Sequence, residues 1–436
     1  MFPFLIPKVE MSSPALSRRQ SSLIRSRCRE SLHRLNSNSS LFSDGEGNGP
    51  TKIIGLNDIE VGAILGSGGF NNVQTIISSR RNSLFLDGSS QQSSSNSVTT
   101  TNTSMRDLVK AASVLTSPSA ERTASMRNLV NTSVTGPARA ASMKRLSSRK
   151  SLKRTSSLES TGSCDSFAVK TLRKSLDTTK MMHGAVDLAK EAKWLSVLSH
   201  KNIISLHCAG ENPGSVDYFL VIERLETSLS DVIGKWQTQN DSLISCGLPR
   251  IQVKQSTKRS IGKRISILYE ATAGIKYLHE KNILFRDLKP ENIGIDPFGI
   301  VKIFDFGLAK ELKPCDQVGP DLYRATRMTG TRRYMAPEVF YGPHYGLPSD
   351  VYSLSILLWQ VMALKTPYSD MNTVEHAAFA FKKKRRPKLE KHWPKPIKTL
   401  IEKGWSHKSK HRPKVGQIHE EMKEYLITQG IEIDEC

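Results

Sequence analysis

The sequence predicts an α+β fold composed of two lobes. Short β-rich segments precede Lys170, whereas helical patterns dominate after Leu225. We therefore expect a small antiparallel sheet with one helix, joined to a larger and mostly helical lobe. Residues 56–428 supply enough chain for two lobes of ordinary domain size, even when the Ser-rich stretch at 78–163 is set aside.

The first lobe begins with a glycine-rich turn between two β-rich segments. This turn is Leu65-Gly66-Ser67-Gly68-Gly69-Phe70-Asn71-Asn72-Val73. Glycine lets backbone amides approach an anion because it has no Cβ. A Gly/Ser cluster taken alone is usually only a turn, so its meaning depends on the segments that follow.

A strand and a helix follow the Ser-rich stretch. The strand is Phe167-Ala168-Val169-Lys170. Glu191 lies in a helical stretch with one apolar face, formed by Val186, Leu188, Leu195 and Leu198. A lysine that binds phosphate needs a carboxylate to orient it, and Glu191 is a candidate for this role. The alternative, a surface ion pair, would contribute only about 0 to 1 kcal/mol.

A polar loop in the second lobe carries the strongest chemical signal. Residues 284–292 are Leu-Phe-Arg-Asp-Leu-Lys-Pro-Glu-Asn, and Asp305 follows an apolar run at 301–304 that predicts a strand. Asp287 can accept a hydroxyl proton, while Asn292 and Asp305 offer hard oxygen ligands to a divalent cation. Lys289 would lie near a phosphate. This set suits phosphoryl transfer, which depends on positioning and charge neutralisation. The alternative is two unrelated polar turns.

A buried helix with an Asp near its start is predicted from Ser349-Asp350-Val351-Tyr352-Ser353 and the apolar run that follows. Its apolar run at 354–364 is interrupted by Gln360 and is shorter than the roughly 20 residues that span a bilayer. We therefore predict a core helix of the helical lobe and no transmembrane segment.

Taken together, these segments resemble the motifs of the protein kinase superfamily, in its Ser/Thr class. The loop at 286–292 and Asp305-Phe306-Gly307 resemble the catalytic and metal-binding loops, and Ala336-Pro337-Glu338 the end of the activation segment. Within the superfamily the chain is most similar to the tyrosine-kinase-like group. That similarity rests on Ser349 to Ser353, Trp359, Gly404-Trp405 and His411-Arg412-Pro413.

The resemblance implies a role for each motif residue. The catalytic set would be Asp287, Lys289, Lys170 and Glu191, and the metal ligands Asn292 and Asp305, with ATP and Mg²⁺ as cofactors. The ATP pocket would contain Leu65, Gly66, Gly68, Val73, Ala168, Lys170, Ile222, Glu223, Leu225 and Gly294. Ile222 would be the gatekeeper, and the backbones of Glu223 and Leu225 would bond adenine. Glu338 would pair with Arg412.

Three residues depart from the family pattern. Asn71 replaces the third loop glycine, and Phe285 replaces the usual histidine before Arg286. We expect Phe285 to keep an apolar contact with Phe306. Gly294 stands where an apolar side chain normally lies beneath adenine, so a gap there and weaker ATP binding are expected. These departures favour the alternative of a catalytically weak or inactive pseudokinase scaffold.

Regulation is expected at the activation segment. In the family, the arginine at the position of Arg286 pairs with a phosphate on that segment. Thr326 and Thr329 are the candidate acceptors. An upstream kinase or autophosphorylation in trans would modify them, and Ser/Thr residues of proteins would be the substrates.

Charge and composition divide the chain further. The net charge is +22, and Lys and Arg outnumber Asp and Glu within 78–163. We predict a disordered basic region at 1–52, a kinase domain at 53–428, a disordered insertion at 78–163 between the second and third strands, and a tail at 429–436. Short Ser-Met-Arg-like repeats within 104–157 suggest partners that bind phosphopeptides. A basic adaptor bound to RNA or a membrane is a third hypothesis, but no nucleic-acid module accompanies the charge.

Six cysteines without metal-ligand spacing suggest reduced thiols in an intracellular, cytoplasmic protein. The Arg- and Ser-rich start leaves an organellar transit peptide open. Residues 382–388 resemble a nuclear import patch. However, Arg386-Pro387 falls where tyrosine-kinase-like enzymes commonly carry the same pair, which favours a structural turn.

Overall fold

The computed structural model describes residues 17–37, 39–42, 52–54, 58–67, 70–79, 166–210, 212–245 and 250–433. All of them belong to one unit, Met1–Phe85 with Gly162–Cys436. The predicted insertion at 78–163 therefore lies outside the described residues, apart from the last two residues of one strand. The repeats at 104–157 lie outside them as well.

One sheet forms the first lobe within these residues. Its strands are β1 (Lys52–Ile54), β2 (Ile59–Ser67), β3 (Asn71–Ser79), β4 (Phe167–Leu172), β5 (Leu206–Gly210) and β6 (Phe219–Glu223), in the order β1-β5-β6-β4-β3-β2. Neighbours are antiparallel, except that β1 runs parallel to β5. The predicted antiparallel sheet is thus confirmed, with an added parallel edge strand. β3 and β4 flank the predicted insertion and pair with each other.

The alternation of side chains along β4 positions the site. Val169 is buried on one face of the sheet, in a small apolar cluster with Phe219. Ala168 and Leu172 are buried on the other face, in the main core. Because successive side chains of a strand point to opposite faces, Lys170 shares the face of Ala168 and Leu172.

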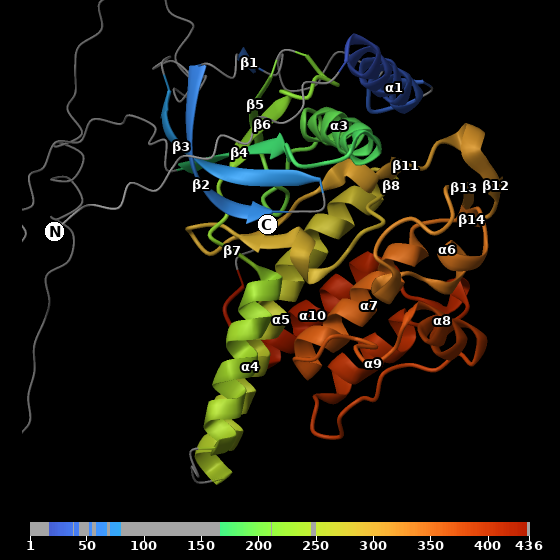
Figure 1. Cartoon of the computed structure of the whole chain (residues 1–436). Coiled ribbons are helices and arrows are strands. Elements are labelled where there is room, and N and C mark those ends of the chain that lie inside the picture. The colour runs from blue at the N-terminus through green and yellow to red at the C-terminus, as the bar shows by residue number, and fades with distance from the viewer. Residues whose placement is uncertain are drawn as a thin grey trace, which may run out of the picture. The chain divides into compact units, whose positions relative to one another are not determined.

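The predicted helix of the first lobe is α3 (Thr178–Leu195). Asp177 caps its start, since the carboxylate accepts a hydrogen bond from the Lys180 amide at 2.9 Å. Glu191 lies on the buried face of α3 with Leu188 and Leu195, as the apolar spacing indicated. Figure 1 shows α3 in green beside the sheet, with another helix, α1, packed along it.

Helix α1 (Arg18–Asn36) corrects one expectation. Residues 1–52 were predicted to be disordered from their basic, Ser-rich composition, and this is wrong for residues 18–36. Ile24 and Cys28 of α1 are each only 1% exposed. The helix is stable because its narrow apolar face is buried against the rest of the fold, which composition alone does not reveal.

The second lobe is mostly helical, as predicted. Its helices are α4 (Leu229–Ser245), α5 (Arg250–Glu280), α6 (Pro337–Tyr341), α7 (Pro348–Ala363), α8 (Thr373–His376), α9 (Lys395–Gly404) and α10 (Val415–Thr428). A π-helical turn at Ala377–Lys382 continues α8. Helix α7 is buried along nearly its whole length and packs against α5 and α9, so it is the core helix that the sequence predicted.

Short strands in the second lobe hold its polar loops. Three of them, β7 (Thr227–Ser228), β9 (Ile293–Ile295) and β10 (Val301–Ile303), form one small sheet. A second pair joins β8 (Ile283–Leu284) to β11 (Lys310–Glu311), and β12 (Gln317–Gly319), β13 (Leu322–Arg324) and β14 (His344–Tyr345) form a third group. The loop at 285–292 therefore runs from β8 to β9, and the loop at 304–309 from β10 to β11.

Two sequence expectations concern features outside the site. None of the helices in the described part of the chain is long and apolar enough to cross a membrane. Cys28 and Cys315 are free thiols.

Candidate active site

The loop that carries Asp287 is anchored from below by Asp350 of α7. The Asp350 carboxylate accepts hydrogen bonds from the backbone amides of Phe285 at 2.8 Å and Arg286 at 2.9 Å. One of its oxygens also lies 3.0 Å from Nε2 of His279. Arg286 has a φ of +72°, a conformation that non-glycine residues rarely adopt. The buried carboxylate of Asp350 therefore fixes the backbone turn that presents Asp287.

The Asp287 carboxylate lies at the centre of a polar cluster. Its Oδ2 atom accepts from Lys289 Nζ at 2.6 Å and from Asn292 Nδ2 at 3.1 Å. Its Oδ1 atom accepts from the amide and the hydroxyl of Thr331, at 2.8 and 2.7 Å. Lys289 Nζ also donates to the Thr331 hydroxyl at 3.1 Å. The structure thus brings together the loop residues that the sequence selected and adds Thr331 from the activation segment.

The buried side chain of Lys170 pairs with Glu191 in the first lobe and with Asp305 in the second. Lys170 Nζ lies 2.6 Å from Glu191 Oε2 and 3.4 Å from Asp305 Oδ1. Burial opposes the charge on Lys170, but Asp305 and Glu191 more than offset it, so the pKa of Lys170 lies above its ordinary value. The ammonium is therefore charged and held between β4, α3 and the loop at 304–309.

Asp305 is presented by an unusual backbone conformation. Its φ is +72°, and its side chain is 42% exposed although Phe306 and Gly307 after it are buried. Phe306 packs against Phe285, with ring centroids 5.3 Å apart and an edge-to-face geometry. The expected apolar contact of Phe285 is thus confirmed. An aromatic residue at this position preserves the packing that holds the Asp305 loop inward.

The glycine-rich turn lies between β2 and β3. Gly66 pairs with Val73 and Ser67 with Asn72, and the Ser67 hydroxyl donates to Asn72 Oδ1 at 2.8 Å. Asn71 belongs to β3 and pairs with Leu172 of β4, so it does not occupy the left-handed conformation expected of a loop glycine. Gly68 lies outside the described residues. Leu65 is 43% exposed at the end of β2.

The connection between the lobes begins at β6. Ile222 is buried and pairs with Ala168 of β4. The Glu223 amide donates to the Ser205 carbonyl at 3.1 Å, and the Glu226 amide to Ile295 at 2.8 Å. Among the described residues the amide of Leu225, which lies between them, has no acceptor, which leaves it free to donate to a ligand.

The expected gap at Gly294 is absent. A Cβ added to Gly294 would stand 2.5 Å from Leu225 Cδ1 and 3.3 Å from Phe304 Cε1. The side chain of Leu225 therefore fills the space that the missing side chain leaves. The sequence-based expectation of an open floor beneath adenine is wrong, because a residue 69 positions upstream supplies the apolar group.

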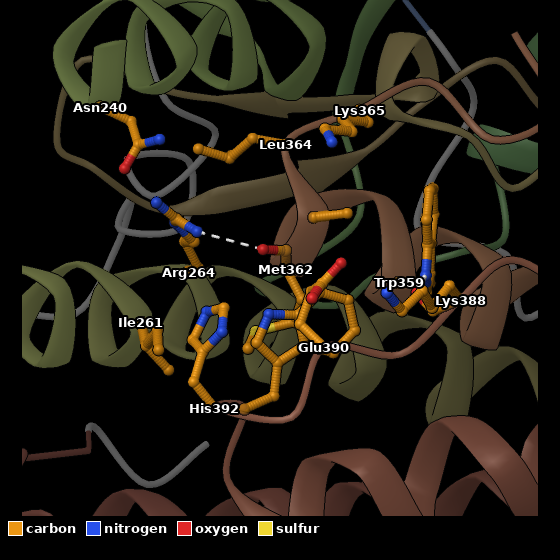
Figure 2. Close-up of a pocket in the computed structure, with 12 residues that line it drawn as sticks. Asn240, Ile261, Arg264, Trp359, Met362, Leu364, Lys365, Lys388, Glu390 and His392 are labelled. Atoms are coloured by element: carbon orange, nitrogen blue, oxygen red, sulfur yellow. Dashed lines mark hydrogen bonds between the residues drawn. The ribbon is translucent and has the colours of Figure 1, made fainter. Parts of the chain in front are cut away.

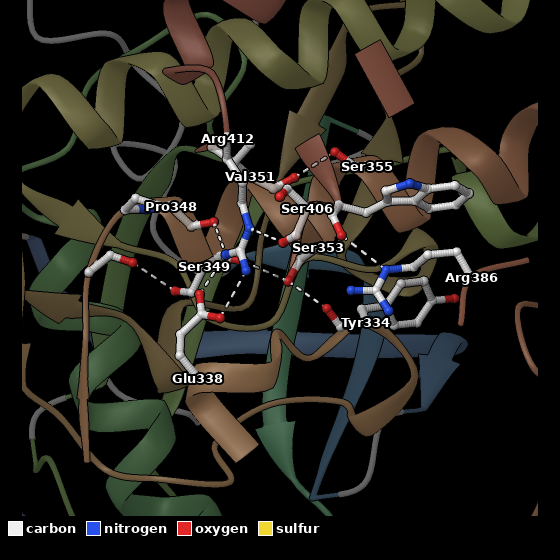
Figure 3. Close-up of polar contacts among 12 residues, drawn as sticks. Tyr334, Glu338, Pro348, Ser349, Val351, Ser353, Ser355, Arg386, Ser406 and Arg412 are labelled. Carbon is white, nitrogen blue, oxygen red and sulfur yellow. Dashed lines mark hydrogen bonds and ion pairs between the residues drawn. The ribbon is translucent and has the colours of Figure 1, made fainter. Parts of the chain in front are cut away.

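The activation segment ends in a buried charge pair, shown in Figure 3. Arg412 Nη1 and Nη2 lie 2.5 and 2.9 Å from the two oxygens of Glu338, as predicted. The same guanidinium donates to the carbonyls of Ser406 and Pro348.

Arg386 donates to the Trp405 carbonyl at 3.0 Å and stacks over Tyr352, which supports a structural role for the Arg-Pro turn.

A separate cavity lies in the helical lobe, between α4, α5, the end of α7 and the segment before α9 (Figure 2). Its volume is about 480 Å³, and it shares no residue with the site described above. Arg264 lines it and donates to the Met362 carbonyl at 3.3 Å, in the last turn of α7. A cation at the end of a helix stabilises its dipole, so this arginine has a structural role.

Sequence reasoning missed part of this arrangement. The sequence indicates Asp350 only as an acidic residue near the start of a buried helix, and no motif singles out His279. The position of Asp350 in a predicted buried helix is a signal, because a buried carboxylate requires hydrogen-bond donors. The sequence does not identify those donors, however, because they are backbone amides, which every residue except proline carries.

Comparison with known proteins places this fold and site in one class. A profile of the protein kinase domain matches residues 155–423, more than half of the chain. The match begins after β2 and β3, which contact the matched region through the pairing of β3 with β4 and through a hydrogen bond from the Arg173 amide to the Phe70 carbonyl at 2.8 Å. The chain belongs to the protein kinase family.

Several curated kinases are similar to this chain. Serine/threonine-protein kinase STY46 of Arabidopsis thaliana is 36% identical over 162 residues, covering 37% of this chain and 27% of that protein. Dual specificity protein kinase shkE of Dictyostelium discoideum is 29% identical over 247 residues, covering 55% and 31%. Human mitogen-activated protein kinase kinase kinase 7 is 30% identical over 234 residues, covering 52% and 34%. The matches span about a third or less of each relative.

Proposed function

We propose that the chain is an active Ser/Thr protein kinase that transfers the γ-phosphate of ATP to protein substrates. The observation that carries this proposal is the simultaneous presence of two charge sets. Lys170 lies 2.6 Å from Glu191 and 3.4 Å from Asp305, and Lys289 donates one hydrogen bond to Asp287 at 2.6 Å. Phosphoryl transfer requires both sets at once, because one orients the nucleotide and the other the acceptor hydroxyl.

The donor atoms fit a nucleotide with a divalent cation. Asn292 uses its amide nitrogen to bond Asp287, which leaves its carbonyl oxygen for a metal. Asp305 contributes an exposed carboxylate. In the part of the chain that the structure describes, no cluster of three His, Cys, Asp or Glu residues forms a complete metal site. This agrees with Mg²⁺, which is usually held by one or two protein ligands together with phosphates and water.

Each side chain then has a defined task. Lys170 would bind the α- and β-phosphates, and the carbonyl of Glu223 and the amide of Leu225 would bond adenine. Lys289 would neutralise charge on the phosphate being transferred. Asp287 would orient the acceptor hydroxyl and take its proton. When bound, Mg²⁺ would offset the charge of the β- and γ-phosphates.

A pseudokinase scaffold is the second candidate. The substitutions that favour it are Asn71, Phe285 and Gly294. Two of them lose force here, because Phe285 packs on Phe306 and the space at Gly294 is filled by Leu225. A basic adaptor is the third candidate, and only the net charge of +22 favours it.

The test is transfer from radiolabelled ATP by the purified full-length protein, followed by identification of the phosphorylated amino acid. We expect phosphoserine and phosphothreonine. Asp287→Asn, Lys170→Met and Asp305→Asn should each abolish transfer, whereas Asp370→Asn, on an exposed loop, should not. Wild-type transfer by a clean Asp287→Asn preparation would refute the catalytic role.

Two results would favour the other candidates. Nucleotide binding without transfer by the wild type supports the scaffold. Binding to RNA or anionic vesicles that weakens with salt and disappears on deletion of residues 78–163 supports the adaptor.

The same proposal includes control by phosphorylation of the activation segment. Arg286 donates from Nε to the Leu308 carbonyl at 2.5 Å, whereas its Nη1 is buried without a partner among the described residues. Burial lowers the pKa of Lys190 in α3, and the nearby charge of Arg286 lowers it further. A phosphate on Thr326 or Thr329 would supply the missing acceptor. An upstream kinase, or a second copy of the chain acting in trans, would add it.

A further inference from the structure

The N-terminal segment, which we define as residues 17–37 and 39–42, is docked on the rest of the fold. Ser17 and Gln20 close a capping box at the start of α1: the Ser17 hydroxyl accepts from the Gln20 amide at 3.2 Å, and Gln20 Oε1 accepts from the Ser17 amide at 2.9 Å. Ile24 and Cys28 point from α1 into the main core. Leu23, by contrast, is 49% exposed on the other side of the helix.

The N-terminal segment contacts both ends of α3. At the start of α3, Gln20 Nε2 donates to the Thr178 hydroxyl at 3.1 Å. At its end, the Phe42 ring lies 5.3 Å from Trp194, and Lys193 Nζ lies over the same ring at 4.9 Å. Glu191, the partner of Lys170, lies between these contacts. The position of Glu191 is therefore coupled to whether the segment is docked.

The segment also contacts the chain just after the Asp305 loop. Lys313 is buried and donates from Nζ to the carbonyls of Arg34, Leu35 and Ser37, at the end of α1. The amide and the hydroxyl of Ser40 both donate to Glu311 Oε1 at 3.0 Å. Because Glu311 belongs to β11, which pairs with β8 immediately before Phe285, the segment bridges α3 and the catalytic loops.

Ser40 is the sensitive point of this bridge. It is exposed, whereas Glu311 is only 4% exposed, and Glu311 Oε2 has no hydrogen-bond partner among the described residues. A phosphate on Ser40 would add almost two negative charges next to that buried carboxylate. The Ser40 hydroxyl lies 3.0 Å from Glu311 Oε1, so the phosphate and the buried carboxylate would repel each other strongly. The phosphorylated segment could not return to the same position.

We propose that the N-terminal segment is an intramolecular clamp that holds Glu191 against Lys170, and that Ser40 is a phosphorylation site that releases the clamp. In the modification, the Ser40 oxygen forms a bond to the γ-phosphorus of ATP and the bond to the ADP oxygen breaks. The hydroxyl proton passes to the base of the modifying kinase. Ligands and modifications shift equilibria between states that already exist. The phosphate would be added while the segment is undocked and would then prevent it from docking again.

The effect on reaction rate rests on the proposed kinase function, but the structural effect does not. The test therefore compares full-length protein carrying phosphoserine at position 40 with the unmodified protein, by hydrogen exchange and by phosphorylation of a peptide substrate. We expect faster exchange in α1, α3 and residues 311–313, with unchanged exchange in α7. The rate should fall by about 5- to 150-fold, the usual range for coupled sites.

Matched variants separate the clamp from general destabilisation. Ser40→Asp and Ile24→Asp should behave like the phosphorylated protein, whereas Ser26→Asp and Leu23→Asp, on exposed positions of α1, should leave exchange and rate unchanged. Unchanged exchange of α1 after phosphorylation of Ser40 would overturn the modification site. Faster exchange of α1 with an unchanged α3 would overturn the clamp. If exchange changes as expected in a wild type that transfers no phosphate, the clamp stands and the kinase proposal fails.

Discussion

Leu225 Cδ1 lies 2.5 Å from the point where a Cβ on Gly294 would stand. The two residues therefore share one volume beneath the expected adenine position. Kinases of this family normally place a side chain at the position of Gly294, and here a residue of the lobe connection replaces it. A smaller side chain at position 225 should therefore be compensated by a larger side chain at position 294.

We predict that Leu225→Ala weakens ATP binding. Loss of part of a buried leucine contact, about 1.5 to 3 kcal/mol when complete, should raise the ATP Kd by roughly tenfold. Gly294→Leu alone should not tighten binding, because Leu225 must first move. The double variant Leu225→Ala/Gly294→Leu should recover most of the ATP affinity that Leu225→Ala loses. Calorimetric titration measures all three, with the volume-conserving Leu225→Met as the control. Tighter binding by Gly294→Leu alone would contradict this account.

A second prediction concerns the anchor of the catalytic loop. Asp350→Ala should leave the buried amides of Phe285 and Arg286 without acceptors, which costs about 1 to 3 kcal/mol for each unsatisfied group. The free energy of unfolding should fall accordingly, and kcat should fall more than KM changes, because Asp287 is no longer held. Denaturant titration and steady-state kinetics measure the two effects.

Asp350→Asn, which keeps one acceptor oxygen, should lie between the wild type and Asp350→Ala in both measurements. Asp370→Asn, on the exposed loop after α7, is the control and should match the wild type. Equal kcat in Asp350→Ala and wild type would show that the loop holds its own conformation.

The third prediction is an acid-sensitive fold. Burial, together with Arg333, Arg332 and Arg386, lowers the pKa of His376 to about 4, and its ring packs against Tyr368 and Phe381. The unfolded chain protonates this histidine near pH 6.5. Between about pH 6.5 and 4 the unfolded state therefore binds the extra proton, so the free energy of unfolding decreases as the pH falls.

The contribution of His376 is at most about 3.5 kcal/mol, at about 1.4 kcal/mol per pKa unit. His376→Phe should flatten the dependence across this window, as measured by urea titration at several pH values. His392→Gln, at an exposed position, should keep the wild-type slope. An identical slope in His376→Phe would mean that folding does not lower the pKa of this histidine.

The fourth prediction tests control at the activation segment. Phosphatase treatment of protein that carries no phosphate on Ser40 should lower activity by about tenfold or more, since one charge-assisted hydrogen bond contributes about 1.5 to 3 kcal/mol. Thr326 is exposed and Thr329 half-buried, so Thr326→Ala should have the larger effect. Peptide phosphorylation before and after phosphatase measures it.

Arg286→Gln should make activity insensitive to phosphatase, because the proposed phosphate ligand is then absent. Thr373→Ala, at the start of α8 outside the activation segment, is the control. Full activity in the Thr326→Ala/Thr329→Ala double variant would exclude this mechanism.

The sequence alone determined the parts of the site that are local in the chain. Asp287, Lys289 and Asn292 lie within one loop, and Asp305 directly follows a strand. Their spacing therefore fixes their chemistry before the fold is known. The pairs Lys170 with Glu191 and Glu338 with Arg412 were also predicted, through resemblance to a family in which these residues meet.

Only the tertiary structure decided which distant residues contact those motifs and hold them in place. The capping residues Ser17 and Gln20, and the helical spacing of Ile24 and Cys28, were visible signals of α1. Composition nevertheless predicted disorder, because a short basic helix is stable only when a partner buries its apolar face. That partner is α3, whose residues follow some 150 positions later in the chain. The contact of Leu225 with Gly294 and the amide bonds of Asp350 are likewise non-local. No local pattern encodes them, because the free energy of each depends on atoms that only folding brings together.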